Sequence, residues 1–391
     1  MKNMKKLMVL MLMMASVFFI ACNNDDDGKD PLSTEQAKEV INSLPTDISA
    51  QMTGMLDAEG LKVMEILMNT PYPFEESTKA AKESSVIFNI NKYLIPNNYL
   101  KNQVSTAKTT EPGFDFNTYK GTYTYHNAPF EYWEIVPGGD KIILNFPSDE
   151  NNMGVNDATL TLNSYSETLI TEVDGQYTYS WYNPTTIDAD LVVDAVKLVD
   201  VNISAEWIVT GENAGEPTAL DAIVFLFPFE FTGEFDHTGA TAGIDFKIKF
   251  DGDVVFGVGL DATFETVEMD EPVNISGYVQ FVDVKVKADA DVKAIIGIME
   301  GLYSETPVYT DPQQLVDALN AEFTATISVD GAKAADIEIA VNPAATTAED
   351  FPFDVVFVFD DGTTQSAIPT FILLLDEMDE FFYFLDGFYQ K

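Results

Sequence analysis

Long stretches of this chain alternate between apolar and polar residues with the period of a β-strand. Between Val199 and Val209 every odd position is apolar, and the even positions from Asp200 to Glu206 are polar. Successive side chains of a strand point to opposite faces, so such a segment fits a sheet with one buried face. The pattern predicts a mainly β (α+β) chain built on a large antiparallel sheet, as a curved sheet or half-barrel or as a sandwich.

Turn residues separate the strand-like segments. Ile244–Phe250 and Val254–Phe264 flank Asp251-Gly252, a dipeptide typical of two-residue hairpins. Within Val273–Ala290 the apolar residues change from one alternating register to the other. A one-residue shift moves side chains to the opposite face of a strand, so this switch predicts a β-bulge or a bend toward a second core.

Helical patterns occur at both ends. Residues 33–80 are predicted to be a helical region, and Ser33 and Gln36 have the spacing of a capping box. Asp311-Pro312 is typical of a helix start, with a cap followed by proline. Leu315, Val316, Leu319 and Phe323 follow it on one predicted helical face. Apolar residues at helical spacing from Leu374 to Leu385 predict a C-terminal helix.

One internal similarity bears on domain organisation. Ala189–Ser204 and Ala325–Ala340 share six of 16 positions at an offset of 136 residues, and both predict a strand, a tight turn and a strand. Chance similarity between hairpins would also explain the match. The predicted antiparallel β domain covers 84–391. If the similarity is a repeat, this domain contains two related β units, at about 84–215 and 216–391.

The N-terminal residues predict where in the cell the protein is located. Three lysines precede an unbroken small or apolar run of 15 residues, from Leu7 to Ala21, which is short for a membrane span and fits the core of a signal peptide. Phe19-Ile20-Ala21-Cys22 resembles a bacterial lipobox, and the acidic residues after it resemble the surface-export signal of Bacteroidetes lipoproteins. The resemblance implies a signal peptide at 1–21, lipid on Cys22, and an acidic linker at 22–32 whose export signal is Asp25, Asp26 and Asp27.

The same resemblance extends into the β-rich region. The stretch from Phe116 to Pro147 looks like the opening of uncharacterised Bacteroidetes lipoproteins, a family without a settled activity. It implies a protein anchored in the outer membrane through its lipid and facing the cell exterior.

The net charge of the chain limits the classes of partner that it can bind. The formal net charge is −43, and it moves to −46 when residues 1–21 are removed, because they carry three lysines and no acids. The chain has no arginine. Nucleic acids bind to basic faces, so we expect no nucleic-acid partner.

No catalytic or metal-binding motif was found. The two histidines, His126 and His237, are far apart in the sequence, and no metal-ligand spacing accompanies them. We therefore expect no cofactor, no metal and no enzymatic activity. A hydrolase that uses two carboxylates is an alternative without a specific signal, because among 64 acidic residues some pair always has a suitable separation.

Two ligand classes remain for a non-catalytic binding or structural role. The first is an apolar molecule or lipid in a half-barrel, where a row of phenylalanines would line the site. Ile223–Phe235 is predicted to be one strand whose phenylalanines share a single face. A filled core would explain the same residues: Phe225, Phe227, Phe229, Phe231 and Phe256. The second is a glycan held by exposed aromatic rings, as in a polysaccharide-uptake system. The stacking residues predicted for it are Trp133, Tyr179 and Trp181, although packing in the sheet would also account for them.

Overall fold

The computed structural model describes residues 30–42, 63, 66, 113–174, 177–211, 213–267, 269, 271–281, 283–302, 311–342 and 353–372. Most of these residues are in strands, and the 17 described strands belong to one mixed sheet that is not closed. The prediction of a mainly β chain with a large, chiefly antiparallel sheet is confirmed. The choice between a curved sheet, a half-barrel and a sandwich stays a prediction.

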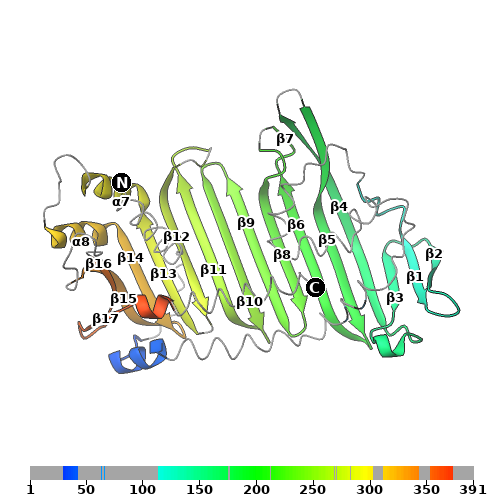
Figure 1. Ribbon diagram of the computed structural model, residues 1–391, viewed down its shortest axis with the longest axis horizontal. Coiled ribbons are helices and arrows are strands. Elements are labelled where there is room, and N and C mark those ends of the chain that lie inside the picture. Colours follow the sequence, from blue (N-terminus) through cyan, green and yellow to red (C-terminus); the bar gives the residue numbers. More distant parts are fainter. Residues whose placement is uncertain are drawn as a thin grey trace. The chain divides into compact units, whose positions relative to one another are not determined.

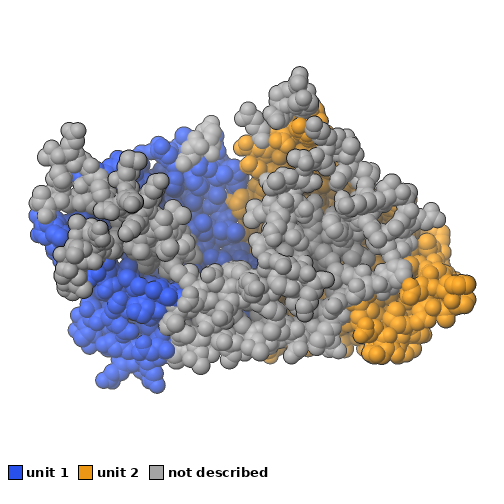
Figure 2. All heavy atoms as spheres, in the orientation of Figure 1, with its two compact units in different colours: residues 1–54, 237–249, 253–391 blue, residues 55–236, 250–252 orange. Residues whose placement is uncertain are grey.

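The chain divides into two compact units, coloured in Figure 2. Unit 1 comprises Met1–Gly54, His237–Lys249 and Asp253–Lys391, and unit 2 comprises Met55–Asp236 and Phe250–Gly252. The sequence-based boundary near 215 lies before this division, and the relationship between the two units stays a prediction.

Nine strands make up the sheet of unit 2, and the last one, β9, ends in residues assigned to unit 1. They are β1 (Gly121–His126), β2 (Tyr132–Pro137), β3 (Ile142–Phe146), β4 (Ala158–Asp174), β5 (Tyr177–Val193), β6 (Val196–Trp207), β7 (Thr210–Gly211), β8 (Pro217–Leu226) and β9 (Phe229–Thr238). A short 3-10 helix, η1 (Glu150–Asn152), precedes β4.

The ladders order these strands as β2-β1-β3-β4-β5-β6-β8-β9. The β1–β3 pair is parallel and the others in this series are antiparallel. β4 and β5 are long and pair with each other beyond the reach of β3 and β6, where β7 runs parallel to β4. Figure 1 shows this β4–β5 arm extending past the neighbouring strands of the unit.

The core of unit 2 is formed by alternate side chains of its strands. In β1 the odd residues Tyr123 and Tyr125 are buried and the even residues are partly exposed. The inward residues of β3, β4, β5 and β6 join them in one apolar cluster, which includes Phe146, Leu160 and Leu191. Burying these side chains on one side leaves the even residues of β1, and their neighbours across the ladder, on the opposite side of the sheet.

The strands of unit 1 follow chain order. They are β10 (Thr241–Phe250), β11 (Asp253–Phe264), β12 (Pro272–Phe281), β13 (Val284–Asp291), β14 (Phe323–Val329), β15 (Ala332–Val341), β16 (Phe353–Val358) and β17 (Thr364–Ser366). The ladders from β11 to β17 are antiparallel between consecutive strands. The predicted turn at Asp251-Gly252 is confirmed, because both residues have positive φ.

Two helices interrupt this order between β13 and β14. In α8 (Pro312–Ala321) the Asp311 side chain accepts a hydrogen bond from the Gln313 N–H, as the cap and proline predict. The helix ends before Phe323, which begins β14, so the prediction of Phe323 on its helical face is wrong. The helix α7 (Val292–Leu302) is not among the sequence-based predictions, although Asp291 supplies a cap by accepting a hydrogen bond from the Ala294 N–H at 2.8 Å.

Two strand predictions are wrong for the same reason. Ile223–Phe235 is two strands, because a turn at Phe227-Pro228 reverses the chain and pairs Leu226 with Phe229. Val273–Ala290 is also two strands, in which Phe281 pairs with Val284 across a tight turn. The change of register in that segment therefore marks a hairpin instead of a bulge, since a two-residue turn also shifts the alternation.

The N-terminal helical prediction is confirmed over 34–42. Ser33 and Gln36 form the predicted capping box, in which the Gln36 side chain accepts from the Ser33 N–H and the Ser33 hydroxyl accepts from the Gln36 N–H. Ala37 and Ile41 of this helix are fully buried. Most of the predicted region up to residue 80 lies outside the described residues, as do the signal peptide, Cys22, Asp25, Asp26, Asp27 and the C-terminal helix from Leu374 onward.

Candidate binding face

An exposed aromatic stack stands where the first hairpin of unit 2 meets solvent. The β1–β2 register pairs His126 with Tyr132 and Thr124 with Glu134. The His126 and Tyr132 rings are stacked, with centroids 4.8 Å apart and planes 15° apart. Glu134 contacts the same imidazole, with 3.1 Å between His126 Nε2 and Glu134 Oε2. Tyr132 is 49% exposed, so these contacts fix the ring while leaving much of it open to a ligand.

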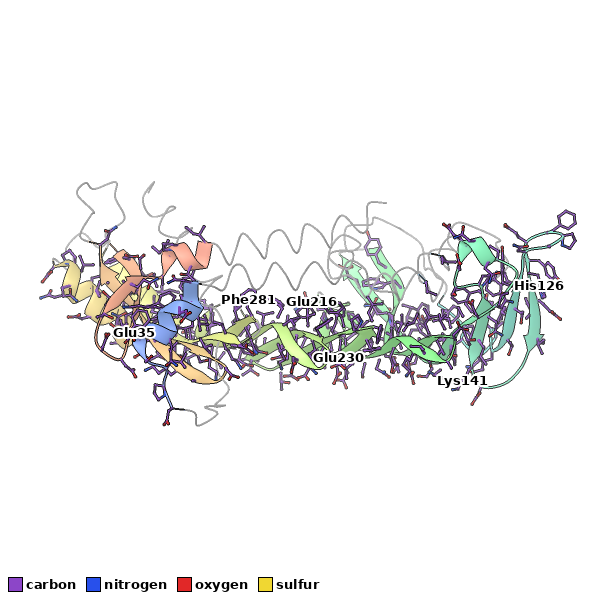
Figure 3. The ribbon with its side chains drawn as sticks, turned by 90° about the horizontal axis from the view of Figure 1, so that it is seen from below. Glu35, His126, Lys141, Glu216, Glu230 and Phe281 are labelled. Atoms are coloured by element: carbon purple, nitrogen blue, oxygen red, sulfur yellow. The ribbon has the colours of Figure 1, made fainter. Side chains whose placement is uncertain are left out.

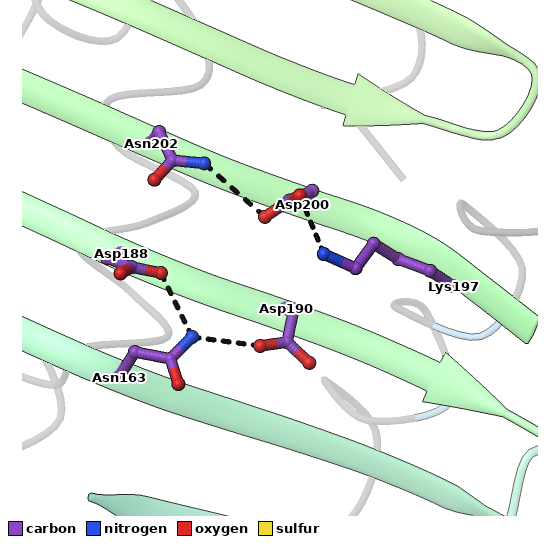
Figure 4. Close-up of polar contacts among 6 residues, drawn as sticks. All are labelled: Asn163, Asp188, Asp190, Lys197, Asp200 and Asn202. Atoms are coloured by element: carbon purple, nitrogen blue, oxygen red, sulfur yellow. Dashed lines mark hydrogen bonds and ion pairs between the residues drawn. The ribbon is translucent and has the colours of Figure 1, made fainter. Parts of the chain in front are cut away.

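A row of amide and carboxylate side chains lies on the same side of unit 2 (Figure 4). Asn163 stands at an irregularity of the β4–β5 ladder between Leu162 and Ser164. Its Nδ2 donates to Asp188 Oδ1 at 2.9 Å and to Asp190 Oδ1 at 2.8 Å, and its Oδ1 accepts from Lys141 Nζ at 2.6 Å. Asn163 keeps the alternation of Thr159 and Thr161 and lies on the polar side, where its side-chain bonds reach Lys141, Asp188 and Asp190. The extra residue shifts the alternation after it, so that Tyr165 is buried on the core side.

The row continues on β6. Asp200 lies directly opposite Asp190 in the ladder, an arrangement of like charges that is unfavourable by itself. Lys197 Nζ donates to Asp200 Oδ2 at 2.8 Å, and Asn202 Nδ2 donates to Asp200 Oδ1 at 3.4 Å. The hydrogen bond to Asp200 raises the pKa of Lys197, and the nearby charges of Asp190 and Asp188 raise it further. The ammonium group therefore offsets the repulsion between the facing carboxylates.

Hydroxyl and amide groups connect the stack to the row. Thr124 of β1 pairs with Asn145 of β3, and Asn145 Oδ1 accepts from the Thr159 hydroxyl of β4 at 3.0 Å. Thr161 then pairs with Asp190. We call the resulting surface the outer face of unit 2; its residues are His126, Tyr132, Glu134, Thr124, Asn145, Thr159, Thr161, Asn163, Asp188, Asp190, Asp200 and Asn202.

The register extends this side further. Ser204 pairs with Asp221 of β8, and Asp221 pairs with Glu234 of β9. Glu230 lies opposite Phe225, four residues along the strands from the Asp221–Glu234 pair and therefore on the same side. Figure 3 labels Lys141 and Glu230, which the side-chain bond and the ladder place on this side.

The outer face can bind a ligand through both stacking and hydrogen bonds. Tyrosine offers a flat ring with a polar hydroxyl, carboxylates accept hydrogen bonds, and amide side chains both donate and accept. Among the described residues, no group of three or more histidine, cysteine or acidic side chains is placed to hold a metal ion. None of the described helices is long and apolar enough to cross a membrane.

Of the residues predicted for glycan stacking, Tyr179 and Trp181 share one face of β5, whereas Trp133 belongs to β2. Trp133 points to the core side, where its ring makes an edge contact with buried Tyr125 at 5.5 Å. Trp181 pairs with buried Ile170 on the β4–β5 arm and lies against Gly215, whose missing Cβ would stand 2.7 Å from the indole. Tyr179 pairs with Glu172 on the same arm. The exposed neighbour Tyr132 takes the position expected for Trp133.

The sequence could indicate only part of this arrangement. Alternation places Tyr132 and Trp133 on opposite faces, but it does not say which face is covered. The pairing of β2 with β1 decides which face is covered. In that ladder Ile135 and Trp133 lie opposite buried Tyr123 and Tyr125 and therefore on the same side of the sheet. His126, expected to be an ordinary residue, becomes a partner of Tyr132 through the same pairing.

The predicted apolar lining is divided by the hairpin. In the β8–β9 ladder Phe225 pairs with Glu230 and Phe231 pairs with Val224, so the two phenylalanines point to opposite faces. The prediction of one aromatic face is therefore wrong. Phe227 lies at the turn and is 43% exposed, with its ring 6.3 Å from Phe225.

The two most buried residues of the predicted lining contact other rings. Phe229 is 5.0 Å from Phe250, and Phe256 in unit 1 is 5.3 Å from Phe281 and 6.2 Å from Phe246. These contacts place Phe229 and Phe256 in packed aromatic clusters. Their use in ligand binding stays a prediction.

A separate pocket of about 360 Å³ is present in unit 1. It lies between the 34–42 helix and the β14–β15 turn, and its volume is at the low end for small-molecule sites. Its lining is mixed acidic and apolar and contains none of the predicted phenylalanines: Asp30, Leu32, Gln36, Glu39, Val40, Val329, Asp330 and Ala332.

Comparison with known proteins leaves the family open. No protein-family model and no curated protein matches the sequence. Among solved structures, the chain is similar to a porin-like protein from Bacteroides vulgatus ATCC 8482, with 9% identity and a TM-score of 0.18. The match covers 52% of this chain and 96% of the other. A likeness at this TM-score carries no conclusion about fold or function.

Proposed function

We propose that this protein is a non-catalytic surface lipoprotein that binds a glycan through the outer face of unit 2. The observation that carries the proposal is the exposed Tyr132 ring, stacked on His126, on the same side of the unit as the hydroxyl, amide and carboxylate groups of the outer face. A sugar ring would stack on Tyr132, and its hydroxyl groups would exchange hydrogen bonds with the polar row.

The attachment to the outer membrane rests on the sequence. The lipobox-like Phe19-Ile20-Ala21-Cys22 and the acids after it would place lipid on Cys22 and expose the protein at the cell surface. A glycan-binding protein in that location would capture polysaccharide outside the cell for an uptake system. Catalysis is not required for this role, and the outer face is proposed to hold its ligand unchanged.

The apolar-ligand alternative receives less support. The hairpin directs Phe225 and Phe231 to opposite faces, and Phe229 and Phe256 are packed against other aromatic rings. A lipid site formed by the five predicted phenylalanines, which include Phe227, would therefore require a different arrangement of the strands. The outer face, in contrast, requires no rearrangement to contact a sugar.

The proposal is tested with the full chain in affinity electrophoresis through gels that contain neutral glucan, mannan, xylan or galactan. We expect at least one glycan to retard the protein, and Tyr132→Ala to weaken the interaction about fivefold because an aromatic contact contributes about 1 kcal/mol. Tyr182→Ala is the matched control, since Tyr182 is a 38% exposed tyrosine outside the outer face.

The result would contradict the proposal if no glycan retards the protein, or if Tyr132→Ala and Tyr182→Ala bind equally well. Release of new reducing ends from a retained glycan would contradict the non-catalytic part alone.

A further inference from the structure

We infer that the outer face of unit 2 selects glycans without acidic groups and excludes uronic-acid or sulfated polysaccharides. This inference rests on the proposed function and names the class of glycan that the face accepts. It is derived from the charges of the face and from the bonds that its lysines already make.

Carboxylates outnumber ammonium groups on this face. Glu134, Asp188, Asp190 and Asp200 contribute four carboxylates. In the part of the chain that the structure describes, the lysines bonded to side chains of the face are Lys141 and Lys197. The adjoining strands β8 and β9 add Asp221, Glu230 and Glu234 on the same side. The field above the face is therefore negative.

Both lysines are already used within the face. Lys141 Nζ donates to Asn163 at 2.6 Å, and Lys197 Nζ donates to Asp200 at 2.8 Å. The pKa of Lys197 is raised first by its bond to Asp200, and the charges of Asp190 and Asp188 add to the effect. An anionic sugar would have to compete with these carboxylates for the ammonium groups, and the chain has no arginine to offer a bidentate alternative.

The chemistry of the acceptors leads to the same selection. An ionised aspartate accepts hydrogen bonds and cannot donate one. It can therefore bond to a sugar hydroxyl, which donates, but it repels a uronate or sulfate group, which also only accepts. Asn202 and the threonine hydroxyls add neutral partners for the remaining sugar oxygens. The ligand that fits is rich in hydroxyl groups and carries no negative charge.

The test uses matched ligands. Neutral glucan, mannan and galactan are each compared with the same polymer after its primary hydroxyl groups have been oxidised to carboxylates. We expect oxidation to weaken binding of a retained glycan at least about tenfold at low salt. Part of that loss should return at about 0.15 M salt, where charges are screened beyond about 8 Å.

A matched pair of variants locates the effect. Asp200→Asn removes one charge from the outer face and keeps an oxygen that can accept from Lys197. Asp336→Asn makes the same change at the corresponding Lys–Asp pair of unit 1, where Lys333 bonds to Asp336. We expect Asp200→Asn to improve binding of the oxidised glycan several-fold and Asp336→Asn to leave it unchanged.

The possible failures are distinct. Equal or tighter binding of the oxidised polymer, with the neutral polymer also retained, would overturn the charge selection and leave the proposed function standing. Retention of oxidised polymers alone would overturn the selection as well. If neither form is retained, the proposed function itself fails. An equal response of Asp200→Asn and Asp336→Asn would show that net charge, and not the outer face, governs binding.

Discussion

The hairpins β5–β6 and β14–β15 belong to different units and share their backbone details. Each turn has two residues of positive φ, Asp194-Ala195 in one and Asp330-Gly331 in the other. The Asp194 N–H donates to the carbonyl of Asp157, and the Asp330 N–H donates to that of Asp283. In each case the acceptor residue directly precedes the strand that pairs with the first strand of the hairpin, which is β4 beside β5 and β13 beside β14.

The same irregularity follows both turns. In the β5–β6 ladder Leu191 pairs with Val199 and Val192 pairs with Lys197, so Leu198 is the extra residue. In the β14–β15 ladder Ala334 is the extra residue, between Lys333 and Ala335. Lys197–Asp200 and Lys333–Asp336 form equivalent ion pairs, at 2.8 and 2.7 Å. These positions differ by the 136 residues of the sequence similarity. Its predicted strand, turn and strand are confirmed, while common origin stays a prediction.

The differences between the hairpins show what this backbone tolerates. At the irregularity, unit 2 buries Leu198 and Val199, whereas unit 1 buries Ala334 and Ala335. Unit 2 accepts an alanine at the second turn position, where unit 1 has glycine. The hydrogen bonds of the turn and the pairing of the strands therefore impose the geometry, and the side chains adapt to the space that each unit provides.

The largest expected effect comes from the buried irregularity. Leu198→Ala should destabilise unit 2 by about 3 kcal/mol, because the lost contacts leave a cavity in the core. Urea unfolding followed by tryptophan fluorescence measures it, since Trp133, Trp181 and Trp207 all belong to unit 2. A loss well below 1 kcal/mol would mean that the leucine site closes around alanine and that both units pack this position alike.

Exchanging the turn residues should have opposite effects of intermediate size. Gly331→Ala should destabilise unit 1 by about 1 kcal/mol, and Ala195→Gly should stabilise unit 2 by a similar amount, because alanine is strained at positive φ. Urea unfolding followed by far-ultraviolet circular dichroism, together with tryptophan fluorescence for unit 2, measures both variants. If both substitutions lower the free energy of unfolding, the two turns differ in some property other than the positive φ values that they share.

The ion pairs should contribute least. Lys197→Met and Lys333→Met should each cost about 0.5 kcal/mol at pH 7, because both pairs are substantially exposed. The pKa of Lys197 is raised in the folded protein, so its contribution is complete below the unfolded pKa and is lost as the pH rises through the folded pKa. Unfolding of Lys197→Met and the unaltered protein from pH 7 to 11 should therefore converge at the alkaline end. A constant difference would assign the effect to packing of the lysine stem.

Local sequence patterns were sufficient to predict the elements that have strong signals. Period-two alternation gave the strands, Asp251-Gly252 gave a turn, and the capping patterns at Ser33 and Asp311 gave helix starts, because each depends on bonds between neighbouring residues. The same local patterns could not separate one strand from two in Ile223–Phe235. A tight turn keeps the aromatic spacing of the sequence while it reverses the direction of the chain.

Which side of each strand is covered depends on the pairing of strands in the folded protein. Alternation separates Tyr132 from Trp133, but the pairing of β2 with β1 turns the tryptophan toward Tyr125 and leaves the tyrosine with His126 outside. The outer face joins residues from Thr124 to Asn202 through ladders between strands, and no local pattern encodes that register. Sequence thus determined the alternation of side chains, and long-range pairing determined which of them meet, because only pairing fixes the neighbours across a sheet.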